Sequence, residues 1–270
     1  MKNISTFRIG IWALALGLGL SCSGTVLPSA AAAAESDLSL SVQSFTWKEF
    51  VGDKQEVKES GTLYGIGYAY EREFDSHVTF KPAAEFFFGP VDYNGHTMSG
   101  ESATTTVDYW GARLEGDLGR RYRPAEAFSL EPFAGLGLRA WLRDIKNGST
   151  ASGSGVSGYT EQWITLQARL GIRTGVDFSS ASAWFAEAGV KLPLYNQNTA
   201  YLSNAGLGSD VTLHPGKQSS LFAETVLKID RFRASLFYDG LRFSASDPSA
   251  GYYQPKSTED IYGIRAGFVF

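Results

Sequence analysis

The chain has few of the residues on which nucleic-acid-binding proteins and most metalloenzymes depend, namely an excess of basic residues, histidine and cysteine. Its 270 residues include one cysteine, two methionines and three histidines, and 24 basic residues stand against 28 acidic ones. A net charge of −4 supplies no clustered positive surface, so we expect no nucleic-acid partner. A single thiol forms no internal disulfide, and no phosphate loop or metalloprotease motif occurs, so we expect no cofactor.

Long apolar runs are also missing. The longest apolar run that does occur lies near the amino terminus and indicates a signal peptide. No stretch of 18 or more apolar residues occurs, which excludes a transmembrane helix. The 12 uncharged residues Ile9 to Leu20 follow Lys2 and Arg8, and a run of alanines precedes Glu35. This pattern predicts a signal peptide over residues 1–34, cleaved after about Ala34, and a mature domain over 35–270.

Cys22 leaves a lipoprotein signal open as an alternative. Such a signal needs a Leu-small-small-Cys box, and the residues here are Gly19-Leu20-Ser21-Cys22. Under the main interpretation Cys22 is removed with the signal peptide, and the mature chain has no thiol.

The remainder alternates between apolar and polar residues, which is typical of β-strands with two different faces. In 128–143, one face holds Phe128, Leu130 and Leu136, and the other holds Glu131, Arg139 and Arg143. This periodicity predicts an all-β fold of about ten antiparallel strands, with eight as the alternative, at 38–50, 60–74, 77–91, 105–123, 128–145, 160–178, 182–195, 218–229, 232–245 and 259–270.

Short and long connections alternate along the chain. The second, fourth, sixth and eighth are tight, such as Asp75-Ser76 and Asp230-Arg231, whereas the odd-numbered ones are longer and polar, such as 146–159 and 196–217. Several predicted strands also exceed the 9–11 residues that a tilted strand needs to cross a bilayer. Short turns at one end and long loops at the other are typical of an outer-membrane barrel with both termini in the periplasm.

The carboxyl terminus favours a membrane barrel over a soluble one. The last strand ends on Phe270 and carries apolar or aromatic residues at every second position: Tyr262, Ile264, Ala266, Phe268 and Phe270. In this strand, and in the segment 130–137 (LEPFAGLG), the chain resembles bacterial outer-membrane β-barrel proteins. The resemblance implies a Gram-negative outer membrane, outer-membrane lipid around the barrel, and recognition of the last strand by the barrel assembly machinery.

If the apolar face meets lipid, the opposite face fills the lumen with charge. The predicted lumen charge network has ten basic and seven acidic members: Lys81, Glu85, Arg113, Glu115, Asp117, Glu131, Arg139, Arg143, Arg169, Arg173, Glu187, Lys191, Glu224, Lys228, Arg233, Asp239 and Arg265. Because unpaired charges in a narrow interior are costly, we expect them to pair and to plug the lumen. The slight basic excess leaves a narrow anion-leaning channel as an alternative.

Two alternatives of other classes remain. A soluble, lipocalin-like periplasmic barrel gives the same alternation with its faces exchanged. Omptin proteases, also ten-stranded, are similar at a coarse level, because they place an Asp-x-Asp pair and an Asp-x-His pair on outer loops. Here Asp92 lacks the second carboxylate, and three residues separate Asp210 from His214, so the sequence predicts no enzyme and no catalytic residue.

By elimination, a specific function lies in the outer loops. Segments 195–198 (YNQN) and 252–255 (YYQP) combine aromatic and amide groups, which are common on recognition surfaces. The sequence therefore predicts a non-enzymatic outer-membrane barrel that acts in membrane integrity or in surface interaction and adhesion, with a possible extracellular ligand at the loops.

Overall fold

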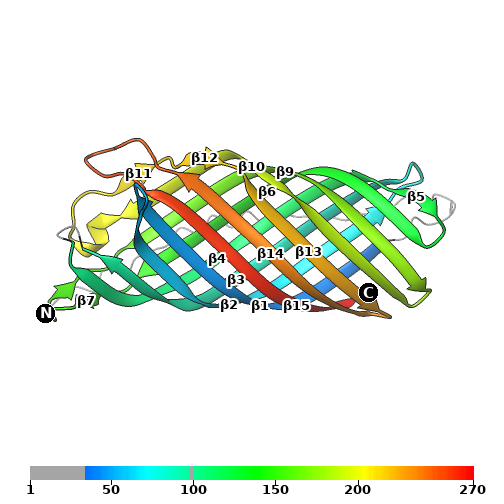
Figure 1. Ribbon diagram of the computed structural model, residues 1–270, viewed down its shortest axis with the longest axis horizontal. Helices are drawn as coiled ribbons and strands as arrows, with labels where there is room; N and C mark the ends of the chain where they lie inside the picture. The colour runs from blue at the N-terminus through cyan, green and yellow to red at the C-terminus, as the bar shows by residue number, and fades with distance from the viewer. Residues whose placement is uncertain (1–33, 98–99) are drawn as a thin grey trace, which may run out of the picture. The chain divides into compact units, whose positions relative to one another are not determined.

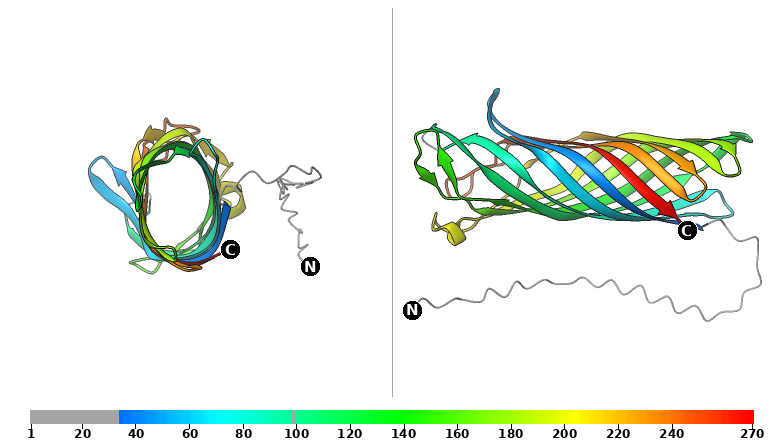
Figure 2. Two further views of the ribbon diagram at one scale, coloured as in Figure 1. Left: turned by 90° about the vertical axis from the view of Figure 1, so that its right-hand side faces the viewer. Right: turned by 90° about the horizontal axis from the view of Figure 1, so that it is seen from below.

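Ten long strands form a closed antiparallel barrel in the computed structural model, which describes residues 34–97 and 100–270 (Figures 1 and 2). The wall consists of β1 (Ala34–Val51), β2 (Lys54–Glu73), β3 (Val78–His96), β4 (Ser102–Arg120), β6 (Phe128–Ile145), β9 (Thr160–Ser179), β10 (Ser182–Tyr201), β13 (Ser220–Ile229), β14 (Phe232–Ser244) and β15 (Lys256–Val269). The predicted fold and strand number are confirmed, and the eight-stranded alternative is wrong. The predicted signal peptide and Cys22 lie outside the described residues.

The first and last strands close the ring. β1 pairs with β15 from Asp37↔Val269 to Phe50↔Lys256. Beyond these pairs, the backbone amides of Ser36 and Phe270 each donate to the other's carbonyl oxygen, at 3.1 and 2.9 Å. The predicted carboxyl-terminal assembly signal is therefore the sealing strand, and its Tyr262, Ile264 and Phe268 side chains are exposed on the outer wall. Recognition of this strand by an assembly machinery remains a prediction.

The connections differ in structure between the two ends. The end that holds Ala34 and Phe270 has tight turns, and we call it the terminal end; the opposite, outer end carries most of the short elements. These are β5 (Tyr122–Ala125) at the terminal end, and β7 (Gly148–Thr150), β8 (Gly155–Val156), η1 (Leu202–Ala205), β11 (Val211–Leu213) and β12 (Gly216–Gln218) at the outer end.

One predicted loop is wrong. The connection after the first strand was expected to be long, but β1 and β2 continue past the barrel wall as a hairpin and turn over Gly52-Asp53 alone. In Figure 2 this hairpin leans away from the ring. Among the described residues, no helix is long and apolar enough to cross a membrane.

The apolar face of each strand points outward. Large hydrophobic side chains are exposed on all ten wall strands, among them Leu40, Ile66, Phe86, Leu114, Leu136, Ile172, Leu192, Leu221, Leu236 and Ile264. The polar partners in the alternation, such as Glu131 and Arg139 on β6, are buried inside. The soluble-barrel alternative requires the reverse arrangement and is therefore wrong.

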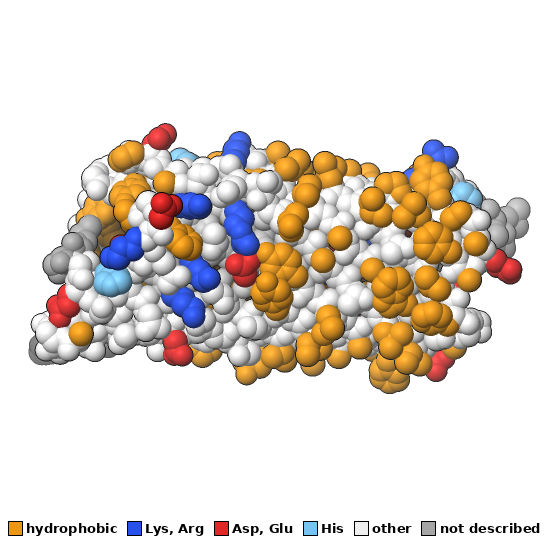
Figure 3. Space-filling view, viewed as in Figure 1, with side chains coloured by type: hydrophobic (Ala, Val, Ile, Leu, Met, Phe, Trp, Pro, Cys, Tyr) orange, Lys and Arg blue, Asp and Glu red, His pale blue; other side chains and the backbone are white. Residues whose placement is uncertain are grey.

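The apolar belt covers only part of the wall. Strands of 18–20 residues, such as β1, β2 and β9, are about twice as long as the 9–11 residues that cross a bilayer. Figure 3 shows apolar side chains gathered toward the terminal end, with charged ones on the outer half of the visible face. Outward positions of the outer half are polar, including Thr46, Asp92, Thr106, Gln162 and Thr258. The outer half of the barrel therefore projects beyond the lipid.

Inward-facing glycines make room for rings that lie against the wall. A Cβ added to Gly263 would come within 2.3 Å of the ring of Phe237, and one added to Gly171 within 2.6 Å of the ring of Phe133. Both glycines therefore act as recesses that let a large side chain lie flat inside a narrow barrel.

The position of the belt predicts where a new charge is tolerated. Leu136→Lys places an ammonium in the belt and should destabilise the barrel by about 2–4 kcal/mol. Thr104→Lys, on the exposed outer half of β4, is the matched control and should change stability little. Urea unfolding in lipid vesicles measures both, and equal costs would contradict the assignment of the belt to lipid.

Candidate functional site

The lumen is the most elaborate polar site of the barrel. The structure places all seventeen members of the predicted charge network in ion pairs within 4 Å, either inside the barrel or at its terminal rim. Most of these pairs join different strands, so the network connects the walls across the lumen.

Asp239 on β14 lies at the middle of the network. Its Oδ2 atom accepts a hydrogen bond of 2.6 Å from Nη1 of Arg113 on β4, and its Oδ1 atom is bonded to the ammonium of Lys191. Because β4 and β14 are five strands apart in the ten-stranded ring, the pair with Arg113 spans the lumen. Arg113 also binds Glu85, which contacts Arg265 at 3.7 Å.

A second group of charges lies nearer the terminal end. Arg169 Nη1 donates to Glu115 Oε1 at 2.5 Å, and Arg173 Nε donates to Glu187 Oε2 at 2.9 Å. Arg173 is also bonded to Glu131, which accepts from Arg121 Nε at 2.9 Å. Arg121 thus belongs to the network although sequence reasoning missed it.

Five further buried carboxylates face the same lumen and were also missed: Asp37, Glu49, Glu59, Glu161 and Glu259. Glu59 and Asp37 lie one residue before the predicted starts of their strands, whereas the other three fall within predicted strands and could have been found by extending the inward alternation. With these five and Arg121, twelve acidic groups stand against eleven basic ones, so the expected basic excess of the lumen is wrong.

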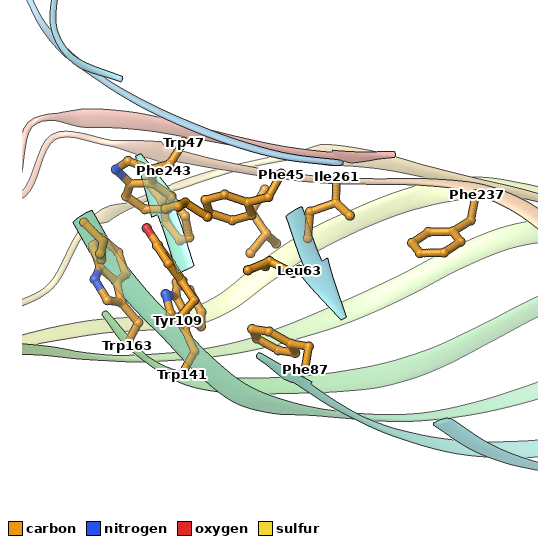
Figure 4. Close-up of a cluster of buried hydrophobic side chains, with 13 residues drawn as sticks. Phe45, Trp47, Leu63, Phe87, Tyr109, Trp141, Trp163, Phe237, Phe243 and Ile261 are labelled. Carbon is orange, nitrogen blue, oxygen red and sulfur yellow. The ribbon is translucent and has the colours of Figure 1, made fainter. Parts of the chain in front are cut away.

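The outer half of the lumen is filled mainly by aromatic and aliphatic side chains (Figure 4). This aromatic plug comprises Phe45, Trp47, Leu63, Phe87, Val91, Val107, Tyr109, Trp141, Trp163, Phe237, Leu241, Phe243 and Ile261. The rings of Trp47 on β1 and Trp163 on β9 are 5.1 Å apart, and those of Trp163 and Phe243 also 5.1 Å. Because β1 and β9 are opposite each other in the ring of ten strands, the contact of Trp47 with Trp163 crosses the full lumen.

Arg143 ties the plug to three carboxylates. Its guanidinium, 2% exposed as a residue, binds Glu59, donates to Glu161 Oε2 at 2.9 Å and lies 3.3 Å from Glu49. The indole Nε1 atoms of Trp47 and Trp163 donate to Glu49 and Glu161, both at 2.9 Å. Glu49 and Glu161 thus each contact both a cationic group and a neutral indole donor, so the buried charges and the rings hold each other in place.

The remaining space is a blind cavity. Two adjoining pockets share Lys81, Glu187, Glu224 and Arg233 among their lining residues. One includes the turn residues Ser180 and Ala181 at the terminal end, and the other reaches Phe237 at the inner edge of the plug. The cavity therefore opens toward the terminal end and stops at the aromatic plug.

The three histidines lie apart, and each has its own partner. His96 Nδ1 lies 3.1 Å from Glu56 Oε2, and His77 pairs with Glu73 at the terminal turn. His214 Nδ1 lies 3.2 Å from the carbonyl oxygen of Asn196. The expected neighbour Asp210 instead accepts from the backbone amide of Ser203 at 3.0 Å.

Asp210 is thus engaged in organising its own loop. Hydrogen bonds from the side chain and backbone of Ser203 hold the pKa of Asp210 below its ordinary value. Within 34–97 and 100–270, no group of three His, Cys, Asp or Glu side chains is placed to hold a metal ion.

No protein-family model and no curated protein matches this chain. Among solved structures it is similar to the outer-membrane protease OmpT from Escherichia coli, with 10% identity, a TM-score of 0.55, and coverage of 88% of this chain and 96% of that one. It also matches the translocator domain of the autotransporter NalP from Neisseria meningitidis, with 16% identity, a TM-score of 0.47, and coverage of 92% and 90%. The chain thus has the fold of bacterial outer-membrane β-barrels, and its apolar belt supports a location in the outer membrane of a Gram-negative bacterium.

The contacts of Arg143 predict the effect of its removal. Arg143→Met leaves three buried carboxylates without their shared cation and should destabilise the barrel by about 3–5 kcal/mol. Adding Glu59→Gln and Glu161→Gln to the same chain removes two of these charges and should restore part of the loss. Chemical unfolding in vesicles measures the series, and a neutral Arg143→Met would contradict the role of this residue.

Proposed function

We propose that the protein is a closed, non-catalytic outer-membrane barrel that displays a structured outer rim for interaction at the cell surface. The observation that carries the proposal is the contact of Trp47 with Trp163 across the full lumen. A barrel whose interior is filled by side chains acts as a rigid support, which leaves its outer end as the variable surface.

The filled lumen supports a non-conducting barrel. Thirteen buried hydrophobic residues occupy its outer half, and the ion pairs below them join opposite walls. A hydrated ion would have to displace packed rings and break buried charge pairs, both of which are costly. The excess of acidic groups also removes the basis for an anion-leaning path.

The histidine contacts support a non-catalytic role. His96 and His214 are held by Glu56 and by the Asn196 carbonyl, and neither contacts an aspartate among the described residues. The omptin arrangement places a histidine beside an aspartate, and no such pair forms among the described residues; the carboxylate beside His96 belongs to Glu56. Cleavage of cationic peptides that is lost in a His214→Ala variant would contradict this part of the proposal.

The outer rim has a small core of its own, which supports a recognition surface. Ala200, Leu202, Val211 and Leu213 are buried together, and Tyr159 and Tyr252 pack against them. Neighbouring Leu207 and Tyr253 are exposed. Ordered loops lose less conformational entropy on binding than flexible ones do, so a rim of this kind is suited to a partner.

Electrical recording tests the closed lumen. The wild-type protein in planar bilayers should give no stable conductance steps, because the plug leaves no continuous water path. A variant with Trp47→Ala, Trp163→Ala and Phe243→Ala removes the rings that meet across the lumen and should conduct if it folds. Heat-modifiable migration on SDS gels checks its folding, and stable steps in the wild type would contradict the proposal.

Loop removal tests the outer rim. Trimming 202–210 or 247–253 should abolish binding of purified protein to cells or matrix proteins, while heat-modifiable migration remains. Trimming the terminal turn at 124–127 is the matched control and should leave binding unchanged. If the wild type binds no surface while its deletion weakens the envelope, a passive role in membrane integrity replaces surface interaction.

A further inference from the structure

The carboxylates around Arg143 outnumber the cations available to them. Three buried carboxylates contact this one guanidinium: Glu49, Glu59 and Glu161. Arg139 also packs against a ring of the plug, but it is bonded to a carboxylate of its own, Glu259. Arg265 is likewise paired with Glu224. With all three carboxylates around Arg143 ionised, two negative charges would stay uncompensated among packed rings. A buried carboxyl group avoids that cost by keeping its proton.

Glu49 is the member of this group with the fewest donors. Glu59 accepts two hydrogen bonds from Arg143 and one of 2.5 Å from the hydroxyl of Tyr109. Glu161 accepts one from Arg143 and one from an indole, both at 2.9 Å. Glu49 accepts only from an indole, at 2.9 Å, and its approach to Arg143 at 3.3 Å forms no hydrogen bond. Because hydrogen bonds from donors favour the ionised form, Glu49 loses least when it takes up a proton.

The surroundings of Glu49 also favour the protonated form. This residue lies beyond the apolar belt, two residues from the end of β1. Burial raises the pKa of its carboxyl group above the ordinary value, Arg143 opposes the rise, and the other two carboxylates add to it. Its partners in the sheet, Val57 and Ser257, are uncharged. The other titratable groups close to the three carboxylates are tyrosines, which are neutral at physiological pH: Tyr93, Tyr109 and Tyr159.

Glu49 lies where the β1–β2 hairpin leaves the wall. The register of β1 against β2 shifts between Glu49 and Phe50, and Phe50 with Lys256 is the last pair between β1 and β15. Beyond this point the hairpin leans away from the ring (Figure 2). Two residues before Glu49, Trp47 belongs to the plug. Charge repulsion at Glu49 therefore acts on the junction between the plug and the hairpin.

We propose that Glu49 keeps a proton at pH values at which an ordinary glutamate is ionised, and that this proton fastens the plug at the base of the hairpin. Loss of the proton adds a second uncompensated charge beside the rings and repels Glu49 from Glu59 and Glu161. The closure of the outer end is then firm in acid and weaker as the pH rises. The proposal rests on the closed lumen of the proposed function, but its test measures proton binding and not conductance, so each can fail without the other.

The pH dependence of unfolding tests this proton. The folded barrel holds the proton more tightly than the unfolded chain does, so its stability should fall as the pH rises from the ordinary glutamate pKa toward the raised one. Glu49→Gln imitates the protonated group, so it should be about as stable as the wild type at pH 4 and more stable at pH 8. Between these values, the ratio of the two folding equilibrium constants should rise by up to about tenfold per pH unit. Urea unfolding in lipid vesicles measures both proteins.

An exposed carboxylate provides the matched control. Glu126→Gln removes the same charge at the terminal end, and its stability relative to the wild type should not change with pH. Heat-modifiable migration on SDS gels confirms that both variants fold. A ratio for Glu49→Gln that is independent of pH, or an equal change in the control, would overturn the proposal.

Infrared spectroscopy of the wild type gives a second measurement that needs no variant. At pH 6, where an ordinary glutamate is ionised, the folded barrel should show the carbonyl stretch of a protonated carboxyl group. Unfolding should remove this band, and Glu49→Gln should weaken it. A folded wild type without the band carries no such proton, and this result alone would refute the proposal.

Discussion

Closure of the sheet in lipid is the constraint from which the other features of this barrel follow. In hydrocarbon every backbone amide and carbonyl needs a partner within the protein, and the β1–β15 pairing from Asp37 to Phe50 supplies the last set. A closed ring then assigns alternate side chains to lipid or to the lumen. Inward groups are largely shielded from solvent and pair with one another across a narrow interior.

The lumen meets this requirement in two ways along its length. Toward the terminal end charges pair, as Arg113 does with Asp239, and some space is left as a cavity. Toward the outer end rings fill the section, and their indole groups donate to the carboxylates that hold Arg143. Arg143 combines both arrangements. It is ion-paired, as the charges toward the terminal end are, and it also packs among the rings of the plug, 5.8 Å from the ring of Trp47.

The sequence was enough to predict the strands, their number and their polarity, because each depends on local alternation. Contacts across the lumen depend on which strands end up opposite, so the meeting of Trp47 with Trp163 was not visible in any local pattern. Glu59 was missed because its strand was expected to start one residue later, at Ser60. The β1–β2 turn was misjudged for a related reason: residues 51–59 are polar enough to be taken for a loop, yet most of them continue the hairpin.

The excess length of the strands connects the interior to the exterior. A barrel only as tall as the bilayer would have its loops at the lipid surface and no wall beyond it. Here the wall continues past the belt, and the rings of the plug pack inside that part of the barrel. The same extension creates outward positions between the belt and the rim, and these are polar, as at Thr46 and Thr258. The proposed closed lumen is consistent with this arrangement, because the side chains that fill the interior also support the part of the wall that lies beyond the belt.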